Sequence, residues 1–218
     1  GLIQKPLMAI GGGKAGFLVY TMASVWLWMF GVHGGLIAYS AMSAIYVTAR
    51  TENAMAFAAS TAAPYPQWCM WPWYTIGGTG CTFALVLLML VRHKSEQTKV
   101  LGKLALPCAI FNINEPVIFG APVIMNAYLA LPFCIIPFIN LGITALAMKI
   151  GLVAMPTGAA IQAYLPVILQ PAMANNSITG ALLQIALIAL DAALYFPFYK
   201  AFDDNAARME AEYAAEEE

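Results

Sequence analysis

The sequence predicts an all-α membrane protein: several transmembrane helices, with broken helices and re-entrant hairpins around a central site. Hydrophobic residues make up 61% of the 218-residue chain and charged residues only 10%, against about a quarter charged in ordinary soluble domains. Apolar stretches run through most of the chain, which leaves too little polar surface for the alternative, a soluble globule. The net charge of −1 gives no reason to expect nucleic acid as a partner.

Four apolar stretches approach or exceed the length of about 20 residues that a spanning helix needs. They are residues 17–47, 75–91, 127–148 and 178–198. The first contains Gly31 and His33 beside two further glycines, which predicts a broken or paired helix rather than one straight rod. Pro132 and Pro137 predict a bend in the third.

The distribution of positive charge predicts the orientation, because cytoplasmic loops carry the excess of Lys and Arg. Placing both chain ends and the loop 92–103 in the cytoplasm leaves only Arg50 and Lys149, of ten basic residues, on the other side. We therefore expect a membrane-embedded domain over residues 1–202 and a solvated, acidic cytoplasmic tail over residues 203–218.

Three further segments are apolar but interrupted by proline and glycine: residues 64–74, 104–126 and 152–171. Non-helical backbone at membrane depth persists only where it is buried in protein or lines a wet cavity. The pattern therefore predicts re-entrant hairpins around a site, and it favours a transporter over an inert anchor.

One of these segments concentrates polar groups in the run FNINEPVIFG, residues 111–120. An ionisable side chain within the membrane indicates a functional site by default, and Glu115 stands here beside Asn112 and Asn114. A carboxylate accepts hydrogen bonds and an amide both donates and accepts, which suits the hydroxyls of a sugar. The alternative is that these groups only cap a broken helix.

Two other polar residues lie within apolar stretches. His33 is flanked by glycines and follows two tryptophans, so it is either part of a site or a satisfied histidine between packed helices. Asp191 stands in the apolar run ALDAA, where a hydrogen bond to another helix is the favoured interpretation.

The sequence predicts no cofactor and no metal. The run TIGGTG, residues 75–80, resembles a phosphate-binding loop only superficially, because the Gly-Lys-Ser/Thr ending is missing. The four cysteines lack paired metal-ligand spacing and lie in apolar surroundings, so we expect buried, inert thiols.

The run NINEPVIFGAPVIMN, residues 112–126, closely resembles the signature of enzyme IIC of the lactose/cellobiose/chitobiose branch of the bacterial sugar phosphotransferase system. Supporting motifs occur in the family's order along nearly the whole chain. They are WMFGVHG at 28–34, TIGGTG at 75–80, LGK at 101–103, KIGLV at 149–153 and GALLQIALIALDAALYFPFYKAFD at 180–203. The family's longer permeases have an upstream helical half, used in dimerisation, which we expect to be missing here.

This resemblance implies a multi-pass protein of the bacterial cell membrane, surrounded by lipid and homodimeric in its full-length form. It implies that a β-linked disaccharide is translocated while a separate cytosolic IIB subunit transfers phosphate from a phosphocysteine to the sugar's 6-hydroxyl. Glu115 and His33 correspond to the polar groups near that hydroxyl. We expect Glu115 to accept the hydroxyl proton and His33 to orient the hydroxyl or stabilise the phosphate, although the two roles could be exchanged.

The resemblance further implies that Asn112, Asn114 and Gly77 bind the sugar. Where relatives often have a tryptophan near a Thr-Thr-Pro run, this chain reads QAYLP, residues 162–166. Tyr164 is the aromatic residue that can replace the tryptophan as a stacking surface. Two other functions stay open: a sugar facilitator or ion-coupled transporter without phosphorylation, and a non-transporting sensor or remnant.

Overall fold

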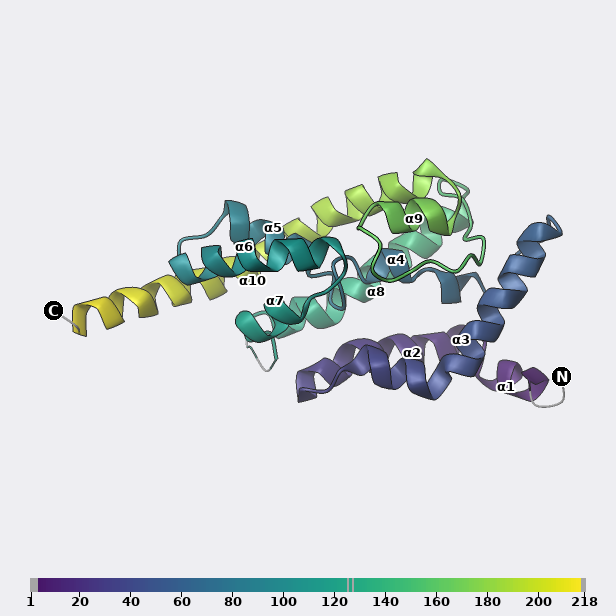
Figure 1. The fold of residues 1–218 in the computed structure, drawn as a ribbon, viewed down its shortest axis with the longest axis horizontal. Helices are drawn as coiled ribbons and strands as arrows, with labels where there is room; N and C mark the ends of the chain where they lie inside the picture. Colours follow the sequence, from purple (N-terminus) through teal and green to yellow (C-terminus); the bar gives the residue numbers. More distant parts are fainter. Residues whose placement is uncertain (1–3, 125, 127, 217–218) are drawn as a thin grey trace.

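The computed structural model describes residues 4–124, 126 and 128–216 (Figure 1). Within these ranges every regular element is helical, which confirms the all-α class. The α-helices are α1 (Gln4–Gly11), α2 (Lys14–Trp26), α3 (Gly34–Ala58), α4 (Trp71–Tyr74), α5 (Phe83–Val91), α6 (Glu96–Ile110), α7 (Glu115–Gly120), α8 (Ala130–Lys149), α9 (Leu169–Ala174) and α10 (Ile178–Glu216). Two short 3-10 helices, η1 (Leu27–Phe30) and η2 (Pro66–Cys69), complete the set.

Two helices in the described ranges, α8 and α10, are long and apolar enough to cross a membrane. They match the predicted spans 127–148 and 178–198. At about 1.5 Å per residue, the 39 residues of α10 extend over about 58 Å, well beyond the roughly 30 Å of a bilayer's hydrocarbon core. Figure 1 shows the C-terminal part of this helix projecting from the rest of the molecule.

The predicted span 17–47 is a pair of helices, as its glycines suggested. Helix α2 continues into η1, the chain reverses at Gly31, which has a φ of 73°, and α3 returns against α2. A Cβ atom added at Gly34 would lie 2.5 Å from the carbonyl oxygen of Ser24. A glycine is therefore needed where the two helices touch.

The predicted span 75–91 is wrong as a single helix. Only Phe83–Val91 is helical, and nine residues are too short to span a bilayer as a helix. Residues 75–82 form a turn in which three glycines and Cys81 have positive φ. The prediction failed because hydrophobic composition does not distinguish such a turn from a helix. The short helix α5 packs against α6 and α10.

The three interrupted segments are broken as predicted. Residues 64–74 contain only η2 and α4, residues 111–114 separate α6 from α7, and residues 152–168 are irregular up to α9. In Figure 1 the irregular segment before α9 loops over the same end of the molecule as α4.

The C-terminal acidic residues are not all solvated, which corrects the expectation for Asp203. Helix α10 continues without a break to Glu216, and Asp203 is only 2% exposed. Its carboxylate accepts hydrogen bonds from the backbone N–H groups of Lys94 (2.6 Å) and Ser95 (3.3 Å). The start of the tail is thus tied to the loop before α6.

Glu210 extends this contact by capping α6 from a distant helix. Its carboxylate accepts hydrogen bonds from the Ser95 hydroxyl (2.7 Å) and from the backbone N–H groups of Glu96 (3.1 Å) and Gln97 (2.9 Å). The Ser95 oxygen in turn accepts from the N–H of Thr98. The free N–H groups of the first turn of α6 are thereby satisfied.

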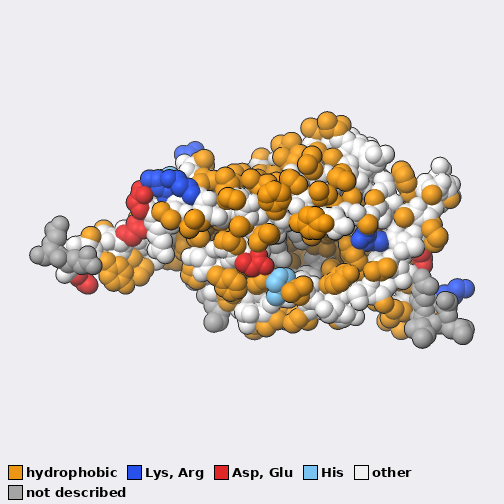
Figure 2. All heavy atoms as spheres, in the orientation of Figure 1, with side chains coloured by type: hydrophobic (Ala, Val, Ile, Leu, Met, Phe, Trp, Pro, Cys, Tyr) orange, Lys and Arg blue, Asp and Glu red, His pale blue; other side chains and the backbone are white. Residues whose placement is uncertain are grey.

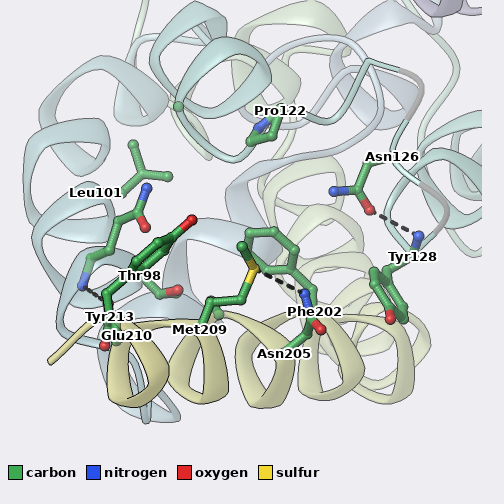
Figure 3. Close-up of a pocket in the computed structure, with 13 residues that line it drawn as sticks. Thr98, Leu101, Pro122, Asn126, Tyr128, Phe202, Asn205, Met209, Glu210 and Tyr213 are labelled. Atoms are coloured by element: carbon green, nitrogen blue, oxygen red, sulfur yellow. Dashed lines mark hydrogen bonds between the residues drawn. The ribbon is translucent and has the colours of Figure 1, made fainter. Parts of the chain in front are cut away.

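Figure 3 shows the groove beside this cap. Phe202, Met209 and Tyr213 rise from α10 on one side, and Pro122 and Asn126 lie across from them. The groove is open to the surface and has a volume of about 370 Å³. The C-terminal part of α10 thus shapes a hollow against the segment that follows α7.

The cap at Glu210 gives a pH-dependent prediction for Glu210→Gln. Hydrogen bonds from Ser95 and from the backbone of Gln97 hold the pKa of this carboxyl below its usual value. A carboxylate whose pKa is lowered by folding contributes its full stabilisation at pH values above its unfolded pKa of about 4.3. This stabilisation is lost as the pH falls through the folded pKa. We expect the free energy of unfolding of the variant at pH 7 to be lower than that of wild type by about 1 kcal/mol or less. The variant should therefore melt at a lower temperature.

Thermal unfolding in detergent, measured from pH 7 down to acid pH, tests this prediction. The difference in melting temperature between wild type and Glu210→Gln should disappear in acid. Glu216→Gln, at the exposed end of the same helix, is the matched control and should behave as wild type. A constant gap at all pH values would contradict the capping role.

Candidate functional site

The candidate site is built around the turn of residues 75–82. Gly77, Gly78 and Gly80 have φ values of 72°, 102° and 84°, which glycine adopts at little cost. The hydroxyl of Thr82 donates to the Gly77 carbonyl (2.9 Å) and closes the turn. This geometry leaves backbone groups of the turn without helical partners.

Asn112 supplies one of the missing partners. It has a left-handed φ of 61° between α6 and α7, and its Oδ1 atom accepts a hydrogen bond from the N–H of Gly77 (2.9 Å). Its Nδ2 atom donates to the carbonyls of Ala163 (3.4 Å) and Leu165 (3.3 Å). One amide therefore joins three segments that are far apart in sequence.

Asn114 holds the other end of the turn. It is 4% exposed, and its Nδ2 atom donates to the carbonyl of Thr79 at 2.6 Å. A Cβ atom added at Gly78 would lie 2.4 Å from Cγ of Asn114. The glycine thus permits the amide to sit directly on the turn.

The structure brings together the predicted site residues Glu115 and His33, which are 82 positions apart in the sequence. Oε1 of Glu115 lies 3.7 Å from Nε2 of His33, and the two side chains are 43% and 41% exposed. Figure 2 shows a histidine and an acidic side chain in contact beside a hollow in this face of the molecule. The separation is too long for a direct hydrogen bond, and both groups are open to the same ligand.

The backbone fixes the tautomer of His33. Its Nδ1 atom accepts a hydrogen bond from the N–H of Leu36 (3.2 Å), as the N-cap of α3. A ring nitrogen that accepts carries no proton, so the proton of the neutral ring is on Nε2, which faces Glu115. The ring also packs on Trp28, with 4.4 Å between centroids. His33 therefore presents a donor to the site, and a purely buried packing role does not describe it.

Tyr164 lies on the irregular segment that Asn112 binds. Its neighbours Ala163 and Leu165 supply the two carbonyls that accept from Asn112, and Tyr164 itself is 66% exposed. The structure thus brings the predicted residues into two joined groups. Glu115 and His33 form one, and Gly77, Asn112, Asn114 and the segment around Tyr164 form the other.

Arg50 is a residue that the sequence analysis used only for orientation. Its guanidinium donates to the carbonyl of Ala159 (2.8 Å) and lies over the ring of Tyr46. Gly158 approaches the backbone of α3 so closely that a Cβ atom there would be 2.4 Å from N of Ala54. Arg50 thus ties the irregular segment to α3. In the sequence, the feature that could have indicated this role is a basic residue within a stretch of mostly uncharged residues.

Asp191 is fully buried and accepts a hydrogen bond from Asn140 of α8 at 3.0 Å. This confirms the interpretation that it bonds to another helix.

Comparison with known proteins identifies the family of the chain. A family model described as the EIIC component of the phosphotransferase system matches residues 1–137. The chain belongs to this EIIC family. The lichenan permease IIC component of Bacillus subtilis (strain 168) is 40% identical over 96% of the chain and 47% of its own length. The cellobiose-specific EIIC component of Geobacillus stearothermophilus is 37% identical over 96% of the chain and 48% of its own length.

A solved EIIC structure has the same fold. The crystal structure of the transporter ChbC, the IIC component from the N,N'-diacetylchitobiose-specific phosphotransferase system, superposes with a TM-score of 0.89 at 36% identity. The match covers 96% of the present chain and 49% of ChbC. The chain therefore spans about half the length of the EIIC proteins that it matches, and the resemblance to the lactose/cellobiose/chitobiose branch is confirmed.

The contact between Gly78 and Asn114 predicts that Gly78→Ala destabilises the protein. The added methyl group would clash with the amide, and alanine is strained at a φ of 102°. We expect a loss of about 1–3 kcal/mol, measured as a lower melting temperature in detergent. Gly142→Ala is the matched control, because a Cβ atom at this position in α8 meets nothing within 4 Å. Equal melting temperatures for the two variants would show that the turn tolerates displacement of Asn114.

Proposed function

We propose that this chain forms the sugar-binding part of a phosphotransferase permease, which takes up a β-linked disaccharide across the bacterial cell membrane. A cytosolic IIB subunit would phosphorylate the sugar's 6-hydroxyl. The observation that carries the proposal is the half-exposed pair of Glu115 and His33, 3.7 Å apart, beside a turn held by two amides. Membership of the EIIC family and relatives named for lichenan, cellobiose and diacetylchitobiose support it.

In this mechanism the chain's residues position the acceptor hydroxyl and stabilise charge, which is most of what phosphoryl transfer requires. The carboxylate of Glu115 accepts the proton of the 6-hydroxyl as the sugar oxygen attacks phosphorus. The phosphoryl group leaves the cysteine sulfur of IIB and bonds to that oxygen. The Nε2–H of His33 donates to the hydroxyl oxygen or to a phosphoryl oxygen, as its tautomer allows.

The remaining site residues would hold the sugar ring. The exposed ring of Tyr164 is available for stacking. Oδ1 of Asn112 has a second lone pair beyond its bond to Gly77, and Asn114 and Gly77 act through the backbone that they fix.

We further propose that the chain is a multi-pass domain over residues 1–202, followed by the acidic segment 203–218, with both ends in the cytoplasm. Residues 92–103, expected as a loop, contain the first half of α6. The bonds of Asp203 and Glu210 with residues 94–97 support this orientation, because they require the start of α6 and the end of α10 to lie on the same side. Lipid surrounds the domain, and the full-length protein is a homodimer.

Glu115→Gln separates phosphorylation from transport alone. The amide keeps the shape of the side chain but cannot accept the hydroxyl proton, so phosphorylation should fall by about a hundredfold or more while sugar binding persists. The measurement is formation of radiolabelled cellobiose, chitobiose or lactose phosphate by membranes that contain the natural full-length protein, with phosphorylated IIB added. If wild type moves sugar without phosphorylating any of the three, a facilitator or ion-coupled transporter replaces this proposal.

His33→Asn tests the histidine without removing the helix cap. The asparagine oxygen can accept from Leu36 as an N-cap, but nothing replaces the Nε2–H that faces Glu115. We expect an unchanged melting temperature and a phosphorylation rate roughly a hundredfold lower in the same membrane assay. A rate equal to that of wild type would assign His33 to capping alone.

A further inference from the structure

A polar cluster lies between α8 and α10, behind the turn of residues 75–82. Asp191 and Asn140 are both 0% exposed. Nδ2 of Asn140 donates to Oδ2 of Asp191 (3.0 Å) and to the sulfur of Cys81 (3.3 Å). Both protons of this amide are therefore engaged.

The other oxygen of each side chain has no hydrogen-bond partner. Oδ1 of Asp191 and Oδ1 of Asn140 are both buried and unpaired. Two buried acceptors without donors are costly, and a buried carboxylate without a cation is more costly still. No basic side chain lies within ion-pair distance of Asp191 in the part of the chain that the structure describes. The ionised form is thus poorly accommodated here.

A single proton on Asp191 removes these deficits together. A protonated carboxyl presents one O–H donor and one carbonyl acceptor, and a primary amide presents the complementary pair. With its proton on Oδ1, Asp191 donates to Oδ1 of Asn140 while Oδ2 continues to accept from Nδ2. We propose that Asp191 and Asn140 form a buried proton-holding pair, in which a neutral aspartic acid fixes the turn beneath the sugar site.

The surrounding titratable groups are committed to other bonds. The Cys81 thiol donates to the carbonyl of Tyr74 (3.2 Å), and the hydroxyl of Tyr195 donates to the carbonyl of Gly80 (2.6 Å). Cys134 of α8 also lies near Tyr195. These thiols and this phenol supply no positive charge that would favour an aspartate anion.

The pair is connected to the candidate site through the turn. Asn140 contacts Cys81, and Tyr195, one helical turn after Asp191, holds Gly80. The same turn presents the N–H of Gly77 to Asn112 and the carbonyl of Thr79 to Asn114. Asp191 is therefore a positioning residue, which acts on the sugar through the backbone of residues 75–82.

Infrared difference spectroscopy tests the proton directly. The natural full-length protein in detergent at neutral pH should show the carbonyl stretch of a protonated carboxyl group, and Asp191→Asn should remove it. Asp204→Asn, which changes an aspartate already paired with Lys94, should leave the band in place. Absence of the band in wild type, or its survival in Asp191→Asn, would overturn the proposal.

Sugar affinity tests the positioning role, and only this part rests on the proposed function. Asp191→Asn can form an amide–amide pair and should bind the disaccharide within about threefold of wild type. Asp191→Ala leaves Asn140 without its partner on α10 and should bind roughly tenfold more weakly. The exchanged double variant Asn140→Asp with Asp191→Asn keeps one acid and one amide, so it should retain both affinity and the infrared band even if Asp191→Ala fails to fold. Equal loss of affinity in Asp191→Asn and Asp191→Ala would show that an anion is required.

Discussion

The grip of two asparagine side chains on the turn of residues 75–82 is the interaction on which the rest of the site depends. The turn pairs some of its own backbone groups, such as the N–H of Gly78 with the carbonyl of Thr75, but the N–H of Gly77 and the carbonyl of Thr79 need partners from outside the turn. Asn112 and Asn114 supply them at 2.9 and 2.6 Å. The break between α6 and α7 therefore holds one side of the turn, and Tyr195 of α10 holds Gly80 from another helix that contacts it.

The same break places the reactive carboxylate. The chain must leave the α6 helix to bring Asn112 and Asn114 to the turn, and the next residue, Glu115, begins α7. His33 likewise stands at the break between η1 and α3. Both proposed catalytic residues thus lie at the N-terminal ends of helices. There the carboxylate of Glu115 and Nε2 of His33 face each other and can contact a ligand.

Some of this could be read from the sequence. Long apolar runs predicted α8 and α10, and glycines predicted the α2–α3 pair, because both features act locally. The span 75–91 was misjudged because apolar composition carries no information on φ. Asp203 was misjudged because its partners, Lys94 and Ser95, are more than a hundred positions away. The approach of His33 to Glu115 is equally non-local, and only the family resemblance indicated it.

The hydrogen bonds made by Asn112 and Asn114 also explain why the carboxylate of this segment is at position 115. Asn112 must accept from a backbone N–H and donate to two carbonyls, and Asn114 must donate to another. An aspartate can accept but cannot donate, and it would place a charge among carbonyl dipoles. Both positions therefore require a neutral amide. Within residues 104–126 a carboxylate is left only at position 115, so a proton removed from a bound hydroxyl in this segment has one acceptor.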